Sequence, residues 1–143
     1  MTATELKTPA SHGRGWMLGL WAAQIALAIF FGMTGYCKSF LSPGALEQMG
    51  IAWAADAPIG LIRFIGIAEL AGAVGIILPS LLRVRPSLTA LAALGFGVIQ
   101  GLAIPFHVIR GEIAITPINA LLLALSLFVV WGRSVKSPIE PRS

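Results

Sequence analysis

The stretch RFIGIAELAGAVGIILP, residues 63–79, decides the fold because it has the composition of a membrane-buried helix yet carries two charges. Arg63 begins it, Glu69 lies near its middle, and the apolar run around it extends over residues 59–82. A membrane span needs about 20 mainly apolar residues. A charge at the centre of such a helix costs about 2.5–3.5 kcal/mol. Glu69 must therefore be protonated or find partners, and intramembrane ionisable residues usually face the bundle interior and mark a functional site.

The composition of the whole chain agrees with a membrane protein. Of its 143 residues, 57% are hydrophobic and 11% are charged, whereas a soluble domain is about half apolar and a quarter charged. The net charge of +4 would suit nucleic-acid binding in a soluble protein, but these few charges lie mostly at helix ends, so we expect no nucleic-acid partner. The single cysteine, Cys37, excludes an intrachain disulfide and paired-cysteine redox chemistry.

Four apolar runs have the length of membrane spans, at about residues 16–37, 59–82, 86–109 and 113–132. The first, third and fourth contain no Asp, Glu, Lys or Arg. We therefore predict an all-α fold, a four-transmembrane-helix bundle over residues 16–133, with tails at residues 1–15 and 134–143. Small residues at helix-packing spacing, such as Gly97 and Gly101, permit close approach of helices.

The distribution of positive charge predicts the orientation. Short cytoplasmic flanks carry an excess of Lys and Arg. Seven such residues lie on the side of the two termini: Lys7, Arg14, Arg83, Arg85, Arg133, Lys136 and Arg142. The other side has Lys38 and Arg110, with Arg63 just inside the membrane. We therefore expect both termini in the cytoplasm and the protein in a bacterial inner membrane.

The long connection at residues 38–58 is expected to lie on the outer side. Ser42 can cap a short helix, Pro43 suits its first position, and Gly50 can end it. This segment could fold over the mouth of the bundle as an ordered lid, lie on the membrane surface, or form a plain loop.

The depth of the polar residues is the most informative feature of the spans. A helix rises 1.5 Å per residue, which places Glu69 about 15 Å and Gln100 about 14 Å below the outer surface. His107 lies near that surface on the same helix face as Gln100, and Asn119 lies about 9 Å down. We therefore expect every strongly polar intramembrane residue in the outer half, and an almost wholly aliphatic inner half.

These residues define a candidate ligand-binding site in the outer half, made of Lys38, Arg63, Glu69, Gln100, His107 and Asn119. Glu69 and His107 are the candidate catalytic residues, and no metal-ligand cluster is evident. Structural alternatives stay open. Glu69 could be neutral and hydrogen-bonded to Gln100, Arg63 could extend to lipid headgroups, and Asn119 could join helices.

Four segments, in this order and spacing, resemble the DoxX-like family of small four-helix membrane proteins: FFGMTGYCKSF, RFIGIAELAGAVGIILP, PFHVIRGE and NALLLALSLFVVWGR. The resemblance covers about residues 16–133. The Gly35-x-x-Lys38 pattern and the GIAEL around Glu69 match recurrent features of the family. The resemblance implies a four-helix membrane bundle. For function it implies either a link to quinone reduction or quinol oxidation in sulfur metabolism, or an accessory or assembly role.

Three hypotheses for function follow. The first is an accessory subunit of a membrane redox system that binds a quinone or another lipophile; with only two histidines, one of them His12 in a tail, the chain has no evident cofactor of its own. The second is a non-enzymatic assembly factor or scaffold. The third is a small acid–base isomerase acting on an apolar substrate. The expected partners are the lipid bilayer, a membrane redox or other protein, or a second copy of the chain.

Overall fold

The computed structural model describes residues 12–143 of the chain, so most of the predicted N-terminal tail lies outside the described residues. The prediction of an all-α membrane bundle is confirmed. Four helices are long and apolar enough to cross a membrane, namely α1 (His12–Phe40), α3 (Ile59–Leu82), α4 (Ser87–Ile109) and α5 (Thr116–Trp131). α1 extends beyond the predicted span 16–37 at both ends, and α5 continues as the π-helix η3 (Gly132–Lys136).

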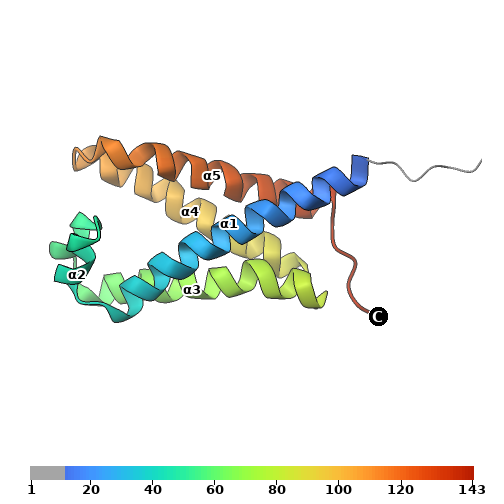
Figure 1. Cartoon of the computed structure of the whole chain (residues 1–143), viewed down its shortest axis with the longest axis horizontal. Helices are drawn as coiled ribbons and strands as arrows, with labels where there is room; N and C mark the ends of the chain where they lie inside the picture. Colours follow the sequence, from blue (N-terminus) through green and yellow to red (C-terminus); the bar gives the residue numbers. More distant parts are fainter. Residues whose placement is uncertain (1–11) are drawn as a thin grey trace, which may run out of the picture.

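The four helices pack as two closely associated pairs joined along one side. α1 packs most extensively on α3, α4 packs on α5, and α3 also contacts α4. In Figure 1, α1 crosses the other helices diagonally. The start of α1 and the C-terminus lie at one end of the bundle, called here the termini end, and α2 lies at the opposite end, the α2 end. The start of α1 and the C-terminus therefore share one side of the bundle, and the cytoplasmic placement of that side stays a prediction.

Large apolar side chains form both the interior and the outer surface. Phe31 of α1 and Phe96 of α4 are stacked in the core, with ring centroids 3.9 Å apart. Other large side chains face outward, including Phe64 at 70% exposure and Leu102 at 67%. Contiguous apolar surface of this kind is rare on soluble proteins, and it suits helices surrounded by lipid tails.

The connection between α1 and α3 is an ordered cap on the α2 end. It contains α2 (Pro43–Gln48) and the short 3₁₀-helix η1 (Ala52–Ala55). As predicted, Ser42 caps α2: its side chain accepts a hydrogen bond of 3.3 Å from the backbone N–H of Ala45. Leu46 of α2 is fully buried against Ala54 and Ile62. The segment of residues 42–57, called the cap from here on, is therefore held on the bundle by apolar packing.

Glycines set the closest approach between α1 and α3, at Gly35 and Gly66, whereas Gly97 and Gly101 of α4 make no such tight contact. A Cβ at Gly35 of α1 would lie 2.9 Å from the carbonyl oxygen of Gly66 on α3. A Cβ at Gly66 would lie 2.7 Å from the backbone nitrogen of Ser39. A Cβ at Gly101, in contrast, would meet nothing within 4 Å. The backbones of α1 and α3 thus touch at a point where any side chain would separate them.

Candidate functional site

A buried ion pair joins α1 to α3. Lys38 Nζ lies 2.6 Å from Glu69 Oε1, and the Thr34 hydroxyl donates to Glu69 Oε2 at 3.1 Å. The side chain of Glu69 is 2% exposed and that of Lys38 is 12% exposed. We call Thr34, Lys38 and Glu69 the α1–α3 site. The sequence indicated Lys38 and Glu69 but not Thr34, although residues 34 and 38 lie four apart and so share a helix face.

The glycine contact explains why this pair can form. Because Gly35 has no side chain, α1 approaches α3 until the position of its Cβ would be only 3.0 Å from Glu69 Cβ. Lys38 lies one turn after Gly35 on α1, and its ammonium reaches the Glu69 carboxylate from the C-terminal end of that helix. The Gly-x-x-Lys spacing of the sequence therefore has a physical reason: the glycine admits the carboxylate and the lysine neutralises it.

The ion pair with Lys38 also explains how the membrane-spanning helix α3 tolerates the carboxylate of Glu69 near its middle. Transfer of a lone charge into the membrane interior is costly, whereas a close opposite charge and a hydroxyl donor offset much of that cost. The alternative in which Glu69 hydrogen-bonds to Gln100 is wrong, since the partners of Glu69 are Lys38 and Thr34.

Arg63 has a different role from either one that the sequence suggested. Its guanidinium Nη1 donates to the carbonyl oxygens of Lys38 at 2.6 Å and Leu41 at 2.8 Å. The last carbonyls of a helix have no partner within the helix, and a cation there also suits the helix dipole. Arg63 of α3 thus caps the C-terminal end of α1, next to the α1–α3 site.

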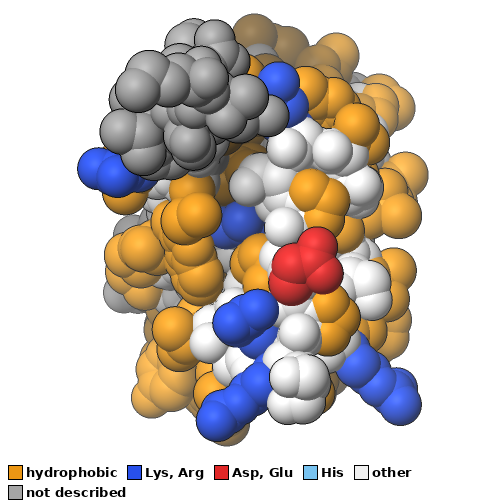
Figure 2. Space-filling view, turned by 90° about the vertical axis from the view of Figure 1, so that its right-hand side faces the viewer, with side chains coloured by type: hydrophobic (Ala, Val, Ile, Leu, Met, Phe, Trp, Pro, Cys, Tyr) orange, Lys and Arg blue, Asp and Glu red, His pale blue; other side chains and the backbone are white. Residues whose placement is uncertain are grey.

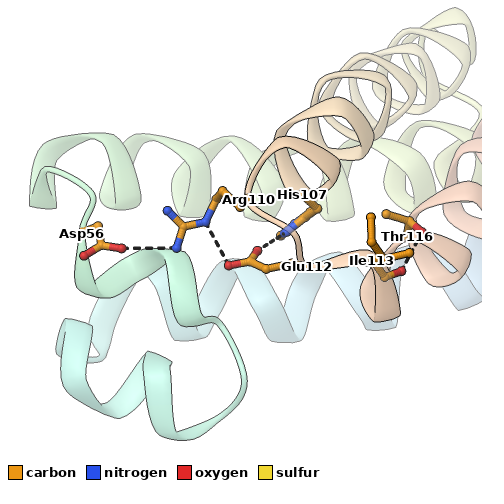
Figure 3. Close-up of polar contacts among 6 residues, drawn as sticks. All are labelled: Asp56, His107, Arg110, Glu112, Ile113 and Thr116. Carbon is orange, nitrogen blue, oxygen red and sulfur yellow. Dashed lines mark hydrogen bonds and ion pairs between the residues drawn. The ribbon is translucent and has the colours of Figure 1, made fainter.

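A second polar network lies at the α2 end, between the cap and the turn from α4 to α5 (Figure 3). His107 Nδ1 lies 2.6 Å from Glu112 Oε2, and Arg110 Nε donates to Glu112 Oε1 at 2.9 Å. Arg110 Nη2 also lies 3.2 Å from Asp56 Oδ2. Since Asp56 belongs to the cap, Arg110 links the cap to the end of α4. His107 and Glu69 hydrogen-bond to different partners.

The network shifts the pKa values of Glu112 and Arg110, which lie outside the spans. The hydrogen bond from His107, followed by that from Arg110, lowers the pKa of Glu112 below its ordinary value. The hydrogen bonds to Glu112 and then Asp56 raise the pKa of Arg110. Glu112 is therefore ionised at neutral pH. The sequence analysis did not select Glu112 or Asp56, although Glu112 lies only five residues after His107.

Gln100 and Asn119 are both buried. Gln100 Oε1 and Asn119 Nδ2 have no hydrogen-bond partner within the described part of the chain. The structure thus places all six predicted residues in the half of the bundle nearer α2 or at its end, but divides them among separate contacts.

Residues 22–129 match the sequence model of the DoxX-like family. The chain belongs to the DoxX-like family. No curated protein and no solved structure matches the chain. The segment that matches the DoxX-like family includes both polar networks described above and all six predicted ligand-binding residues.

The expectation that every strongly polar intramembrane residue lies in the half nearer α2 is wrong for this DoxX-like bundle. Gln24 is fully buried in the other half; it donates to the carbonyl oxygen of Ile76 at 2.7 Å and accepts from Arg133 Nε at 2.6 Å. The hydroxyls of Ser80 and Thr89 are 2.7 Å apart and are also buried. The sequence analysis did not select Gln24, Ser80 or Thr89, although it selected the equally uncharged Gln100 and Asn119.

Arg133 was assigned to the flank after the fourth span, yet only 7% of it is exposed. The π-helix η3 extends the helical path past Trp131. Gly132 lies so close to Leu20 of α1 that a Cβ would overlap that side chain. This contact brings α5 against α1, so the guanidinium of Arg133 lies between the helices, over the ring of Trp21 at 5.4 Å.

Proposed function

We propose that the α1–α3 site binds the polar head of a quinone-like or other lipophilic small molecule, and that the protein is an accessory subunit of a membrane redox system in the bacterial inner membrane. The observation that carries the proposal is the buried Lys38–Glu69 pair, at 2.6 Å, with its cation and anion supplied by different helices. Membership in the DoxX-like family supports the membrane location.

The chemistry of the pair suits a carbonyl ligand. An ammonium has three N–H donors, and the bond from Lys38 to Glu69 uses one of them. Lys38 is also the more exposed partner, at 12% against 2%. A quinone oxygen would therefore accept a hydrogen bond from Lys38, while Glu69 holds the ammonium in place.

Reduction of a quinone to a quinol consumes two electrons and two protons. Lys38 can donate one of these protons to the quinone oxygen that it contacts and would then be reprotonated from water, while Glu69 stabilises its ammonium form. The second proton would reach the other quinone oxygen from water. The two electrons would come from a redox subunit associated with this protein. The role proposed for this chain is thus to bind the ligand and handle protons.

A scaffold or assembly role is the second candidate, and one observation favours it. Gly95 and Gly101 lie on the outward side of α4, where an added Cβ would meet nothing within 4 Å. Outward small residues let a helix of another protein, or of a second copy, approach closely. An acid–base isomerase has less support, because Glu69 and His107 hydrogen-bond to different groups.

The experiment is native mass spectrometry of the purified full-length protein in mild detergent, with solvent extraction of bound small molecules. The matched variants are Glu69→Gln and Glu47→Gln. Both remove one carboxylate charge, but Glu47 lies exposed on α2. Circular dichroism and thermal unfolding verify that each variant is folded.

The proposal predicts that a quinone or other lipophile accompanies the wild type and Glu47→Gln but is depleted from folded Glu69→Gln. Equal retention by all three proteins would contradict binding at the α1–α3 site. A second protein retained by all three, with no small molecule, would favour the scaffold role; loss of that protein in Gly101→Leu would locate its contact on α4.

A further inference from the structure

A pocket lies at the termini end, away from the α1–α3 site. Its volume is about 340 Å³, within the range of small-molecule sites. Its walls come from α1, from the end of α3, from η3 and from the C-terminal segment. It is lined by apolar side chains that include Met17, Trp21, Leu81 and Ile139, and by the polar residues Ser80, Arg83, Arg133, Ser137 and Glu140. Figure 2 shows this end of the molecule, with basic side chains gathered around a hollow.

Among the residues that line this pocket, Arg133 gives the strongest indication that a ligand binds there. It is 93% buried, since only 7% of it is exposed. Its Nε is bonded to Gln24 and its Nη1 contacts the carbonyl oxygen of Ser137 at 3.4 Å, whereas Nη2 has no hydrogen-bond partner among the described residues. A buried donor without an acceptor is costly. A guanidinium edge of this kind matches the oxygens of a phosphate group.

The charges around the pocket favour an anion. Among the described residues, six Lys or Arg lie at the termini end, Arg14, Arg83, Arg85, Arg133, Lys136 and Arg142, against the single acid Glu140. The rest of the described chain has three basic residues and four acidic ones. The pocket itself contains Arg83, Arg133 and Glu140, so its net charge is +1.

The C-terminal segment forms one wall of the pocket. Arg83 Nε donates to the carbonyl oxygen of Glu140 at 2.9 Å, and the backbone N–H of Arg142 donates to the carbonyl oxygen of Arg83, also at 2.9 Å. These bonds hold residues 137–142 across the end of α3. The pocket therefore has both basic and apolar lining residues, and one of them, Trp21, suits a membrane interface.

We propose that this pocket binds a phosphate group, with Arg133 and Arg83 as its cationic ligands. The apolar lining and the interfacial position suit the headgroup of an anionic phospholipid, and the same residues would accept free inorganic phosphate. This proposal is independent of ligand binding at the α1–α3 site, because the two sites share no residue.

The test uses the full-length protein in mild detergent. Native mass spectrometry measures retention of phosphatidylglycerol against phosphatidylcholine with the same acyl chains, and calorimetry measures binding of inorganic phosphate. The matched pair is Arg83→Gln and Arg85→Gln. Both residues have a positive φ, at 58° and 45°, in the same turn, but only Arg83 lines the pocket. Glu140→Gln removes the pocket's one acid.

We expect the wild type to retain phosphatidylglycerol over phosphatidylcholine. Arg83→Gln should weaken retention about tenfold, the order expected for one charge-assisted hydrogen bond. Arg85→Gln should change it little, and Glu140→Gln should strengthen it. Arg133→Lys tests the guanidinium: a loss similar to that of Arg83→Gln, with folding intact, supports the proposal.

Binding of inorganic phosphate with the same dependence on Arg83 and Glu140 would support the site and identify a soluble phosphate as its source. Equal losses in Arg83→Gln and Arg85→Gln would overturn the proposal, because they would indicate diffuse attraction to a basic surface. Equal retention of the two lipids by the wild type, together with no binding of phosphate, would overturn it as well.

Discussion

Lys38 at the end of α1 and Glu69 in the middle of α3 form a 2.6 Å ion pair across 31 residues of sequence. The pair holds the last turn of α1 at the depth of Glu69. Arg63 fixes the same turn by binding the carbonyl oxygens of Lys38 and Leu41. The end of α1 is therefore determined by groups on α3, and the cap begins from that fixed point.

The ion pair predicts strong coupling between its two residues. Glu69→Leu leaves the Lys38 ammonium without its partner, and breaking a buried pair from one side costs about 3–5 kcal/mol. We expect Lys38→Met to destabilise the protein similarly, since it leaves the carboxylate unpaired. The double variant should regain most of that loss. A double-mutant cycle by denaturant unfolding in detergent measures the coupling energy, and simply additive losses would show that the pair contributes nothing.

The contact between Gly35 and Gly66 predicts intolerance to the smallest side chain. Gly35→Ala places a methyl group 2.9 Å from the Gly66 carbonyl oxygen and 3.0 Å from Glu69 Cβ, so α1 and α3 must separate. Overpacking of this kind costs about 1–3 kcal/mol. The control is Gly101→Ala, which meets nothing within 4 Å and should be neutral or slightly stabilising, because alanine favours helix. Thermal unfolding of both variants compares them directly, and equal stabilities would argue against the close approach.

The hydrogen bonds from Arg63 predict that this residue stabilises the C-terminal end of α1. Arg63→Met removes two hydrogen bonds from the end of α1 and leaves two partly buried carbonyl oxygens without this donor, at a cost of about 1 kcal/mol or more. The loss should appear as faster hydrogen exchange in residues 38–48. Arg85→Met, on the turn between α3 and α4, serves as the control. Unchanged exchange at the end of α1 in Arg63→Met would contradict the capping role.

The lowered pKa of Glu112 predicts that acid weakens the attachment of the cap to the end of α4. Because its folded pKa is lowered from the ordinary 4.5, the carboxylate contributes stability that is present above pH 4.5 and is lost as the pH falls through the lower folded value. Protonation removes the negative partner of His107 and Arg110, and Arg110 is the link to Asp56. Hydrogen exchange in residues 42–57, corrected for the intrinsic pH dependence of exchange, should therefore increase as the pH is lowered below 4.5.

The matched variant for this pH effect is Glu112→Gln. Hydrogen exchange in the cap of this variant should be faster at neutral pH, and it should no longer increase on acidification through protonation of residue 112. The partial exposure of Glu112 and Arg110, at 26% and 30%, limits the effect through solvent screening. An acid response of the same size in the wild type and the variant would assign it to other groups.

The sequence determined most of the architecture. Four apolar runs of span length predicted the bundle, and the Ser42-Pro43 start of α2 predicted the short helix of the cap. These features follow from local physics, because a bilayer requires long apolar helices and a capping residue acts within one turn. Burial of Glu69 was predictable for the same reason.

The tertiary structure alone decided which residues are partners. The sequence indicated Lys38 and Glu69 separately, but only the glycine contact of α1 with α3 brings them to 2.6 Å. Arg133 is the opposite case, since its place after an apolar run predicted a solvated flank, and the approach of Gly132 to Leu20 buried it instead. The physical reason is the same in both. Depth along a helix follows from residue count, whereas the partners of a side chain depend on how closely two backbones approach and at what angle, which no single span encodes.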